Sequence, residues 1–462
     1  MERKNAWVAH AKMANERERF AKEYMSFLDH GKTERECVTE ALRLADDRGF
    51  QPLAKLTQDG RNLQPGDRVS FAWMNKSFVL YIIGKRPLEE GMNILGAHID
   101  SPRLDAKQNP LFEEQGLAYL DTHYYGGIKK YQWLALPLAL HGVVVKKDGT
   151  RVSLAIGEDD ADPVFCITDL LPHLAKDQME KNASKFVEGE ALNLLIGSQP
   201  DEKEEKDAVT ARIREILAEK LGMEEEDFLS AELEIVPAGR AREMGLDRSM
   251  ILGYGHDDRC CAYPSLAAML DFDGVPEYTL CCVLTDKEEI GSVGATGMAS
   301  RYFENLTAEL LAASGDFREI SLRRALANSR MLSSDVSAAF DPGFASAFET
   351  KNSAYLGKGI CFNKYTGSRG KSGSNDANAE FVAEIRRIMD GADVCFQMSE
   401  LGRVDQGGGG TIAYLCAKYG MNVIDCGIPV LSMHAPWEVI SKADLYEGYC
   451  CYCAFLRGAR PL

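Results

Sequence analysis

The adjacent glutamates Glu288 and Glu289 follow an apolar run of β-type residues, 278–284, and precede Gly291. Side chains alternate between the two faces of an extended chain, so neighbouring carboxylates at a strand end can point in different directions. One carboxylate can then hold a metal ion while the other acts as a base toward a water molecule. This division of roles predicts a metal-dependent hydrolase. The alternative is a solvated acidic loop, the usual setting of a Glu-Glu pair.

Four other segments place metal-type ligands at the ends of apolar runs or beside turns. His98 ends a short apolar run, and Asp100 stands where its carboxylate could accept the second ring N–H and fix the imidazole tautomer. The other segments offer Asp257, Asp335 and His434. Binding sites of open α/β sheets gather at the carboxyl ends of strands, so we expect these side chains to converge. The alternatives are a core position for His98 and a capping role for Asp335.

The number of candidate ligands suggests how they are shared. A catalytic zinc takes about three protein ligands and keeps one position for water. Two histidines and three carboxylates can therefore serve two metal ions if one carboxylate, Asp257, bridges them. Two ions about 3.5–4 Å apart would hold a water molecule between them, and Glu288 would pass its proton to the leaving amine. The remaining histidines, including His10, have no comparable setting in the sequence.

The elements that must position these residues change in character along the chain. Residues 6–29 and 33–48 carry apolar side chains at helical spacing, and strand-like runs follow up to residue 97. From residue 250 onward, β-type and helical runs alternate, which indicates α/β layering with a largely parallel sheet between helices. We predict a catalytic α/β domain formed by residues 1–106 and 246–462. An inserted β-rich domain, residues 107–245, interrupts it.

Composition narrows the possible partners. The 462 residues include 70 acidic and 53 basic ones, a formal net charge of −17, which argues against a nucleic-acid partner. No run reaches the roughly 18 apolar residues of a membrane span, and the charged segment 1–20 lacks the apolar core of a secretory signal. The 13 cysteines include adjacent pairs in apolar runs, which is typical of reduced core thiols. We therefore expect a cytoplasmic protein.

The order of these segments resembles that of the aspartyl aminopeptidases, a family of zinc metallopeptidases with two metals in each active site. The resemblance covers nearly the whole chain. The motifs that carry it are His-x-Asp-Ser-Pro at 98–102, Asp-Asp-Arg at 257–259, Asp-x-Glu-Glu-x-Gly-Ser at 286–292, Ser-x-Asp at 333–335 and Ser-Met-His at 432–434. Segments 335–342 and 125–133 lack histidines that the eukaryotic members carry, which indicates a divergent, bacterial branch.

The resemblance implies two Zn²⁺ ions per subunit, and Co²⁺ or Mn²⁺ would also suit mixed nitrogen and oxygen ligands. It implies Glu288 as the general base and a cis peptide bond between Asp257 and Asp258. The implied ligand sets are His98, Asp257 and Asp335 for one ion and Asp257, Glu289 and His434 for the other. The inserted domain would mediate dimerisation, and dimers would assemble into a tetrahedral dodecamer whose active sites face an internal cavity.

The expected reaction is removal of N-terminal residues, preferentially Asp and Glu, from peptides. Lys364 stands where the family places a substrate-facing lysine, although a surface lysine is nearly as consistent. Gly408 and Gly409 belong to a glycine run whose backbone N–H groups could hold a substrate carbonyl or carboxylate, or which could only allow close packing. The alternatives are a broad or neutral-residue aminopeptidase, a deacylase of small amides, and an inactive member serving assembly or peptide binding.

Overall fold

The computed structural model describes residues 3–315 and 317–461. The chain divides into two compact units. The first comprises Met1–Asp100, Ala241–Met433 and Glu438–Leu462, and the second comprises Ser101–Arg240 and His434–Trp437. The sequence predicts that the inserted domain starts at residue 107. The sheet of the second unit begins earlier, at Arg103, where β5 (Arg103–Glu114) pairs with Tyr125 of the next strand.

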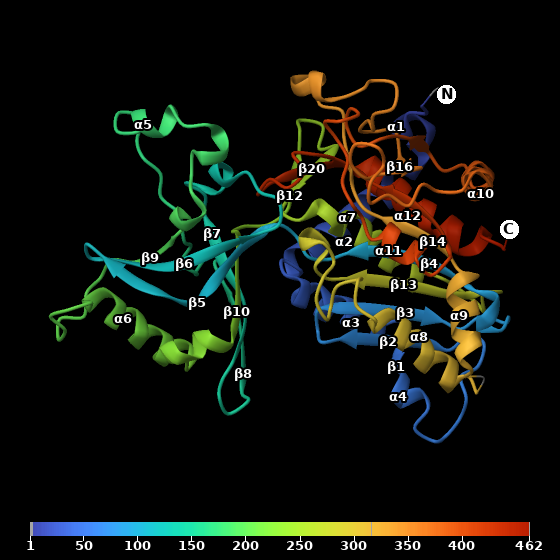
Figure 1. Cartoon of the computed structure of the whole chain (residues 1–462), viewed down its shortest axis with the longest axis horizontal. Coiled ribbons are helices and arrows are strands. Elements are labelled where there is room, and N and C mark those ends of the chain that lie inside the picture. The colour runs from blue at the N-terminus through green and yellow to red at the C-terminus, as the bar shows by residue number, and fades with distance from the viewer. Residues whose placement is uncertain (1–2, 316, 462) are drawn as a thin grey trace. The chain divides into compact units, whose positions relative to one another are not determined.

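The first unit is built on a nine-stranded sheet with the order β1-β2-β3-β13-β4-β14-β18-β16-β17 (Figure 1). Its four central strands are β13 (Thr279–Thr285), β4 (Met92–His98), β14 (Arg330–Ser334) and β18 (Asn422–Gly427), and they run parallel. The outer strands are β1 (Gln51–Pro52), β2 (Arg68–Trp73), β3 (Ser77–Ile82), β16 (Ile360–Asn363) and β17 (Phe396–Met398). Antiparallel pairs β3–β13 and β16–β18 border the parallel centre. The predicted α/β class with a largely parallel central sheet is confirmed.

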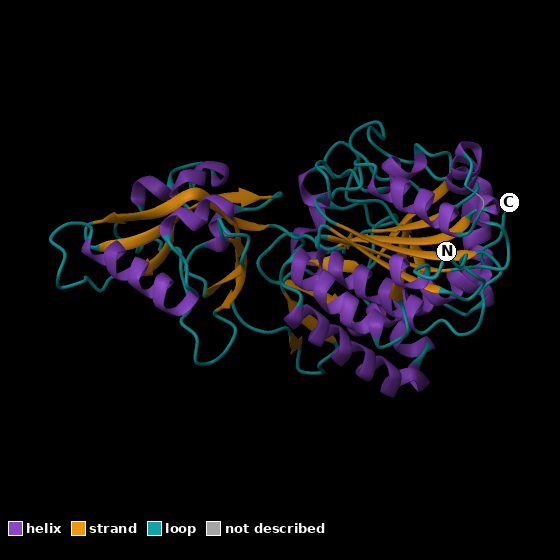
Figure 2. Ribbon diagram, turned by 90° about the horizontal axis from the view of Figure 1, so that it is seen from below, coloured by secondary structure: helices purple, strands orange, loops and turns teal. Residues whose placement is uncertain are grey.

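Helices cover both faces of this sheet (Figure 2). In β13, Leu280, Cys282 and Leu284 enter one apolar core, whereas Cys281 and Val283 enter the other. An unbroken apolar run is what a strand buried on both faces requires. One core receives α2 (Ala14–His30), α3 (Glu34–Asp46), α7 (His256–Leu270), α10 (Ala379–Gly391) and α12 (Lys442–Gly458). The other receives α8 (Tyr302–Ala313), α9 (Glu319–Ala327) and α11 (Ala413–Ala417).

The N-terminal helices differ in part from the pattern in the sequence. The single helix expected over 6–29 is divided into α1 (Ala6–Ala9), a 3₁₀ turn, η1 (Ala11–Met13), and α2. The α3 helix begins after Thr33, whose hydroxyl accepts the backbone N–H of Glu36 in a capping box. That reciprocal cap explains why the next helix starts so sharply.

A smaller five-stranded sheet of the first unit supports the start of α7. Its order is β11-β12-β20-β19-β15. The strands are β11 (Arg242–Met244), β12 (Met250–Gly253), β20 (Glu438–Ser441), β19 (Pro429–Leu431) and β15 (Ser337–Ala338). The strand β12 leads into α7 and pairs with β20, which places Gly253 opposite Glu438 shortly before α7 begins.

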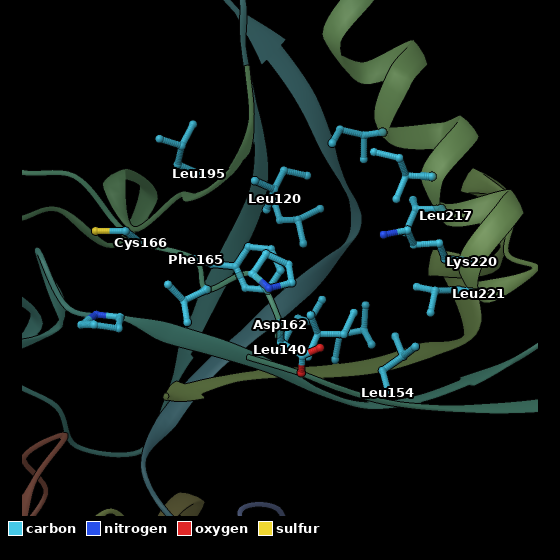
Figure 3. A pocket seen from close by; sticks show the side chains of 18 of the residues that line it. Leu120, Leu140, Leu154, Asp162, Phe165, Cys166, Leu195, Leu217, Lys220 and Leu221 are labelled. Atoms are coloured by element: carbon cyan, nitrogen blue, oxygen red, sulfur yellow. The ribbon is translucent and has the colours of Figure 1, made fainter. Parts of the chain in front are cut away.

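The second unit is an antiparallel six-stranded sheet with the order β8-β7-β10-β5-β6-β9. Besides β5, its strands are β6 (Leu117–Tyr125), β7 (Leu138–Val145), β8 (Arg151–Ile156), β9 (Leu194–Gly197) and β10 (Ala231–Pro237). One helix, α6 (Ala208–Ile216) continued by the π-helical turn η6 (Leu217–Leu221), packs on it. An apolar cavity of about 830 Å³ lies between this helix and the strands, lined by side chains such as Leu140, Phe165 and Leu217 (Figure 3).

All 13 cysteines are free thiols. Within the described part of the chain, no helix has both the length and the apolar character that a membrane crossing needs. The groups of metal-type side chains found among the described residues lie in the first unit.

Candidate metal centre

The carboxyl ends of the parallel strands bring three of the predicted residues together. His98 is the last residue of β4, and its register partner on β13 is Thr285, shortly before Glu288. Asp335 follows β14 directly. Since β13, β4 and β14 are neighbours that run in one direction, the segments after them meet at one edge of the sheet.

Two further contacts fix the start of α7 at this edge. The peptide bond between Asp257 and Asp258 is cis, as the family resemblance implies. The backbone N–H of Asp257 donates to Glu438 Oε2 at 3.0 Å, and Asp258 Oδ2 accepts the backbone N–H of His98 at 3.2 Å. Glu438 therefore positions Asp257 through the backbone. Sequence reasoning assigned Glu438 no such role, because nothing local links residues so far apart.

The two glutamates are held differently from the prediction. They do not extend β13: Lys287 adopts a left-handed conformation (φ 68°), and Glu288 and Glu289 start a 3₁₀ turn, η8 (Glu288–Ile290). With about three residues per turn, neighbouring side chains of this turn diverge by roughly 120°. The carboxylate of Asp100 accepts both backbone N–H groups, that of Glu288 at 3.1 Å and that of Glu289 at 3.2 Å. The divergence of the two carboxylates thus comes from a helical turn.

Two groups of potential ligand atoms result, and each lies within 4.8 Å. One comprises His98, Asp257 and Glu289, and the other comprises His98, Glu288 and Asp335. His98 Nε2 lies 3.2 Å from Asp257 Oδ1. The grouping differs from the ligand sets implied by the resemblance, since Glu288 lies with Asp335 and His98.

The ring of His98 is oriented from its other nitrogen. Nδ1 lies 3.0 Å from the backbone oxygen of Asp100 and 3.3 Å from Asp100 Oδ1. The ring proton is therefore placed on Nδ1, and Nε2 faces Asp257. A carbonyl or carboxylate partner on the far nitrogen is the usual support of a metal-binding imidazole.

Electrostatics at this edge suit a cation. Burial raises the pKa of Asp335 well above its ordinary value, and the charge of Glu288 raises it further. Burial alone would lower the pKa of His98, but its bonds to Asp100 and Asp257 outweigh burial and raise it well above 6.5. A divalent cation among these groups would offset the repulsion between carboxylates. Imidazole and carboxylate are zinc ligands, so the side chains present fit this metal.

His434 belongs to neither group of ligand atoms and falls in the second unit. Its backbone is left-handed (φ 64°), as is that of Ser432 (φ 58°). Its Nδ1 lies 2.8 Å from the carbonyl oxygen of Gly127. A histidine anchored in this way presents Nε2 to other partners.

The predicted substrate residues lie outside both groups. Lys364 is exposed and follows β16 directly. Gly408 has a left-handed backbone (φ 106°), and a Cβ there would lie 1.8 Å from the carbonyl oxygen of Gly367. Gly409 accepts the backbone N–H of Gly367 at 2.6 Å. Close packing of two loops therefore requires glycine at 408.

The buried residue His256 lies next to the centre, and its burial leads us to predict how the free energy of unfolding depends on pH. Burial lowers its pKa to about 3, against 6.5 in an unfolded chain. The hydroxyl of Tyr24 donates to Nδ1 at 2.6 Å, and Nε2 donates to the Ile251 carbonyl at 3.2 Å, so the folded ring is neutral. Between pH 6.5 and about 3 only the unfolded chain binds this proton. The free energy of unfolding should then fall with falling pH by up to about 1.4 kcal/mol per pH unit from this group.

Urea unfolding at a series of pH values, with chelator present throughout, measures this effect. We expect His256→Gln to be less stable at neutral pH but to lose this part of the acid dependence. The exposed residue His173 provides a matched control, His173→Gln, that should keep the wild-type slope. Parallel slopes for the wild type and His256→Gln would contradict the prediction.

An imidazole and several carboxylates gathered at the carboxyl edge of parallel strands are typical of the class of metal-dependent hydrolases. Residues 27–456 match the family of the aminopeptidase I zinc metalloproteases, M18. The chain belongs to this family and is a zinc metallo-aminopeptidase.

Similar proteins support this assignment. A probable M18 family aminopeptidase 1 from Clostridium acetobutylicum is 58% identical over 457 residues, which cover 98% of both chains. The crystal structure of an M18 aminopeptidase from Thermotoga maritima superposes with a TM-score of 0.95 at 44% identity, covering 99% of this chain and 100% of the other. The yeast mApe1 dodecamer, at 19% identity and a TM-score of 0.74, covers 94% of this chain and 95% of its own, and shows the fold alone.

Proposed function

We propose that this aminopeptidase uses two metal ions and removes N-terminal Asp or Glu in preference to neutral residues. The observation that carries the first part is the pair of ligand groups at the sheet edge, which share His98. A single cation would leave one of these groups of close carboxylates without a counter-charge. Zinc is the expected metal, and Co²⁺ or Mn²⁺ would suit the same donors.

The proposed ligands are His98, Asp257, Glu289, Asp335 and His434, with Asp257 shared. The orientation of His98 through Asp100 and the position of Asp257 beside His98 Nε2 support this set. His434 is included on its sequence motif and on the bond that occupies its Nδ1. Catalytic zinc sites commonly use about three protein ligands per ion, which this set supplies when one carboxylate is shared.

When bound, the metal ions polarise the scissile carbonyl and increase the acidity of water. Glu288 takes the proton of the attacking water and passes it to the leaving amine nitrogen. Asp100 is the positioning residue for this step, because its carboxylate holds the backbone N–H of Glu288 and orients His98. The base and the ring are thereby fixed by one buried carboxylate.

The acidic preference requires a cation that faces the substrate side chain. We propose Lys364 for this role, and we propose that the loop of Gly408 and Gly409 borders the substrate. A pocket of about 180 Å³ beside this loop is lined by Gly408, by the basic residues Arg369, Lys371 and Arg403, and by the acidic residues Glu400 and Asp405. The excess of basic side chains supports a site for an anionic group, although Lys364 itself does not line this pocket. The packing of Gly408 on Gly367 supports a shaping role for the glycines.

Initial rates on Asp-, Glu- and Leu-anilides test the preference. We expect Lys364→Met to lower kcat/KM for the Asp and Glu substrates by about 10–100-fold, the effect of one lost charged hydrogen bond, and to change the Leu rate little. Lys351→Met, at another exposed lysine, is the matched control. Higher wild-type rates on Leu would favour a neutral-residue enzyme, and hydrolysis only of N-acyl amides would favour a deacylase. No turnover by metal-loaded protein would favour an inactive member.

We further propose a cytoplasmic homo-oligomer in which the second unit mediates dimerisation and dimers form a dodecamer. The exposed apolar residues of this unit support an interface, and they include Val164, Leu170, Leu171, Leu174 and Met179. The dodecameric state of yeast mApe1 points in the same direction. Light scattering during size exclusion measures the mass, and a monomer at micromolar concentration would contradict this part of the proposal.

A further inference from the structure

We propose that His10, Cys395 and Glu447 form a second kind of metal site in this protein, a thiolate-containing site for a zinc-type divalent cation. Their potential ligand atoms lie within 4.8 Å of one another. These residues are distinct from the proposed ligands of the peptidase centre. His10 had no metal-type neighbour in the sequence, so the site arises only when three distant segments meet.

The three donors come from elements that pack together. His10 is the residue between α1 and the 3₁₀ turn η1, Cys395 directly precedes β17, and Glu447 lies in α12. Ala6, Cys395 and Ala443 share a small apolar cluster, which joins α1 to α12 next to the site. Cys395 and Glu447 are buried, and the side chain of His10 is 19% exposed. An ion thus has two anchored ligands and one open side.

The distances among the donors are close to those of a zinc ligand set, one shorter and one longer. His10 Nδ1 contacts Glu447 Oε1 directly and lies 4.0 Å from Cys395 Sγ. Zinc bonds of about 2.0–2.3 Å in a tetrahedral arrangement separate ligand atoms by roughly 3.2–3.8 Å. The sulfur must therefore approach and the carboxylate must withdraw by less than about 1 Å each. Side-chain rotation provides shifts of this size.

Neighbouring groups already orient two of the three ligands. Glu447 Oε2 accepts the backbone N–H of Cys395 at 2.8 Å, which leaves Oε1 for the site. On the far side of the imidazole, His10 Nε2 lies 3.6 Å from Asp393 Oδ2. At this distance Asp393 is an ion-pair neighbour and not a hydrogen-bond acceptor, and its charge favours a proton on Nε2, which leaves Nδ1 for a metal.

Charge also favours a divalent ion. Burial raises the pKa of the Cys395 thiol to about 12, with the charge of Glu447 as the next contribution, so a lone thiolate beside that carboxylate is costly. One thiolate and one carboxylate together balance a dication, and a neutral imidazole completes a mixed sulfur, nitrogen and oxygen set. Such a set selects zinc over magnesium or calcium, which prefer oxygen alone. Water would fill the fourth position.

Cobalt spectroscopy of the full-length protein tests this site. The protein is stripped with a chelator and titrated with Co²⁺ without oxygen. We expect a cobalt–thiolate charge-transfer absorption that saturates at one ion per chain. The proposed peptidase ligands offer only nitrogen and oxygen, so failure of the two-metal proposal would leave this absorption intact. Restored peptidase activity without any thiolate absorption would overturn the site.

Variants assign the absorption to its residues. Cys395→Ser should abolish it, lower the zinc content by one ion per chain relative to the wild type, and keep peptidase activity. The half-buried residue Cys453 on α12 gives the matched control Cys453→Ser, which should keep both the absorption and the zinc content. His10→Asn, at the more exposed position, provides a second variant and should also lose the ion. Persistence of the thiolate absorption in Cys395→Ser would overturn the assignment.

Discussion

Replacement of Glu288 by Gln is expected to lower kcat by about 10²–10⁴-fold while both metal ions stay bound. Gln keeps the size and polarity of Glu but cannot accept the proton of the attacking water. The bond from the Glu288 backbone N–H to Asp100 is unaffected by the side chain, so η8 should keep its conformation. Steady-state rates together with the metal content after desalting check this result.

The metal content of Glu288→Gln decides whether Glu288 acts as a base or as a metal ligand. Its carboxylate lies with His98 and Asp335 in one of the two ligand groups, so a ligand role is the competing interpretation. Loss of an ion from Glu288→Gln would support that interpretation and remove the residue from the role of base. Glu319→Gln, at an exposed glutamate of α9, serves as the control and should change neither rate nor metal content.

Replacement of Asp257 by Ala is expected to release both ions together. Turnover should fall by about 10³-fold or more as the ions leave. The contact between Asp257 and Glu438 uses the backbone N–H of Asp257, which alanine retains. The start of α7 should therefore stay in place, and the loss should be local to the centre. Elemental analysis after desalting and circular dichroism distinguish metal loss from unfolding.

A matched variant separates a shared ligand from an ordinary one. Asp335→Ala removes a carboxylate that the proposal assigns to one ion only, so it should lose one ion per chain and keep the other. Retention of one ion at full occupancy in Asp257→Ala would show that Asp257 does not bridge. Equal losses in both variants would instead indicate a single cooperative site.

The apolar runs of the central strands could be recognised in the sequence, and they led to the correct α/β class. The alternation of Leu280, Cys281 and Cys282 between two cores follows directly from strand geometry and accounts for one adjacent cysteine pair. The position of His98 at a strand end was equally visible. These features depend on short-range periodicity, which a single sequence displays.

Other features depend on contacts between distant segments. The one-turn helix at Glu288 begins after a left-handed Lys287 and is held by Asp100, so extended geometry was the wrong basis for the divergence of the two glutamates. The support of Asp257 by Glu438 likewise joins two different elements, α7 and β20. A pattern of neighbouring residues does not predict contacts of this kind.

The types of donor, their places at the ends of apolar runs and the layered fold could all be recognised in the sequence, because side-chain chemistry and strand periodicity are local properties. Which donors lie close enough to share a cation became visible only in the folded chain. His98 lies with two pairs of carboxylates, and His10 meets Cys395 and Glu447. The distance between residues far apart in the chain is set by how helices and strands pack, and packing is a property of the whole core.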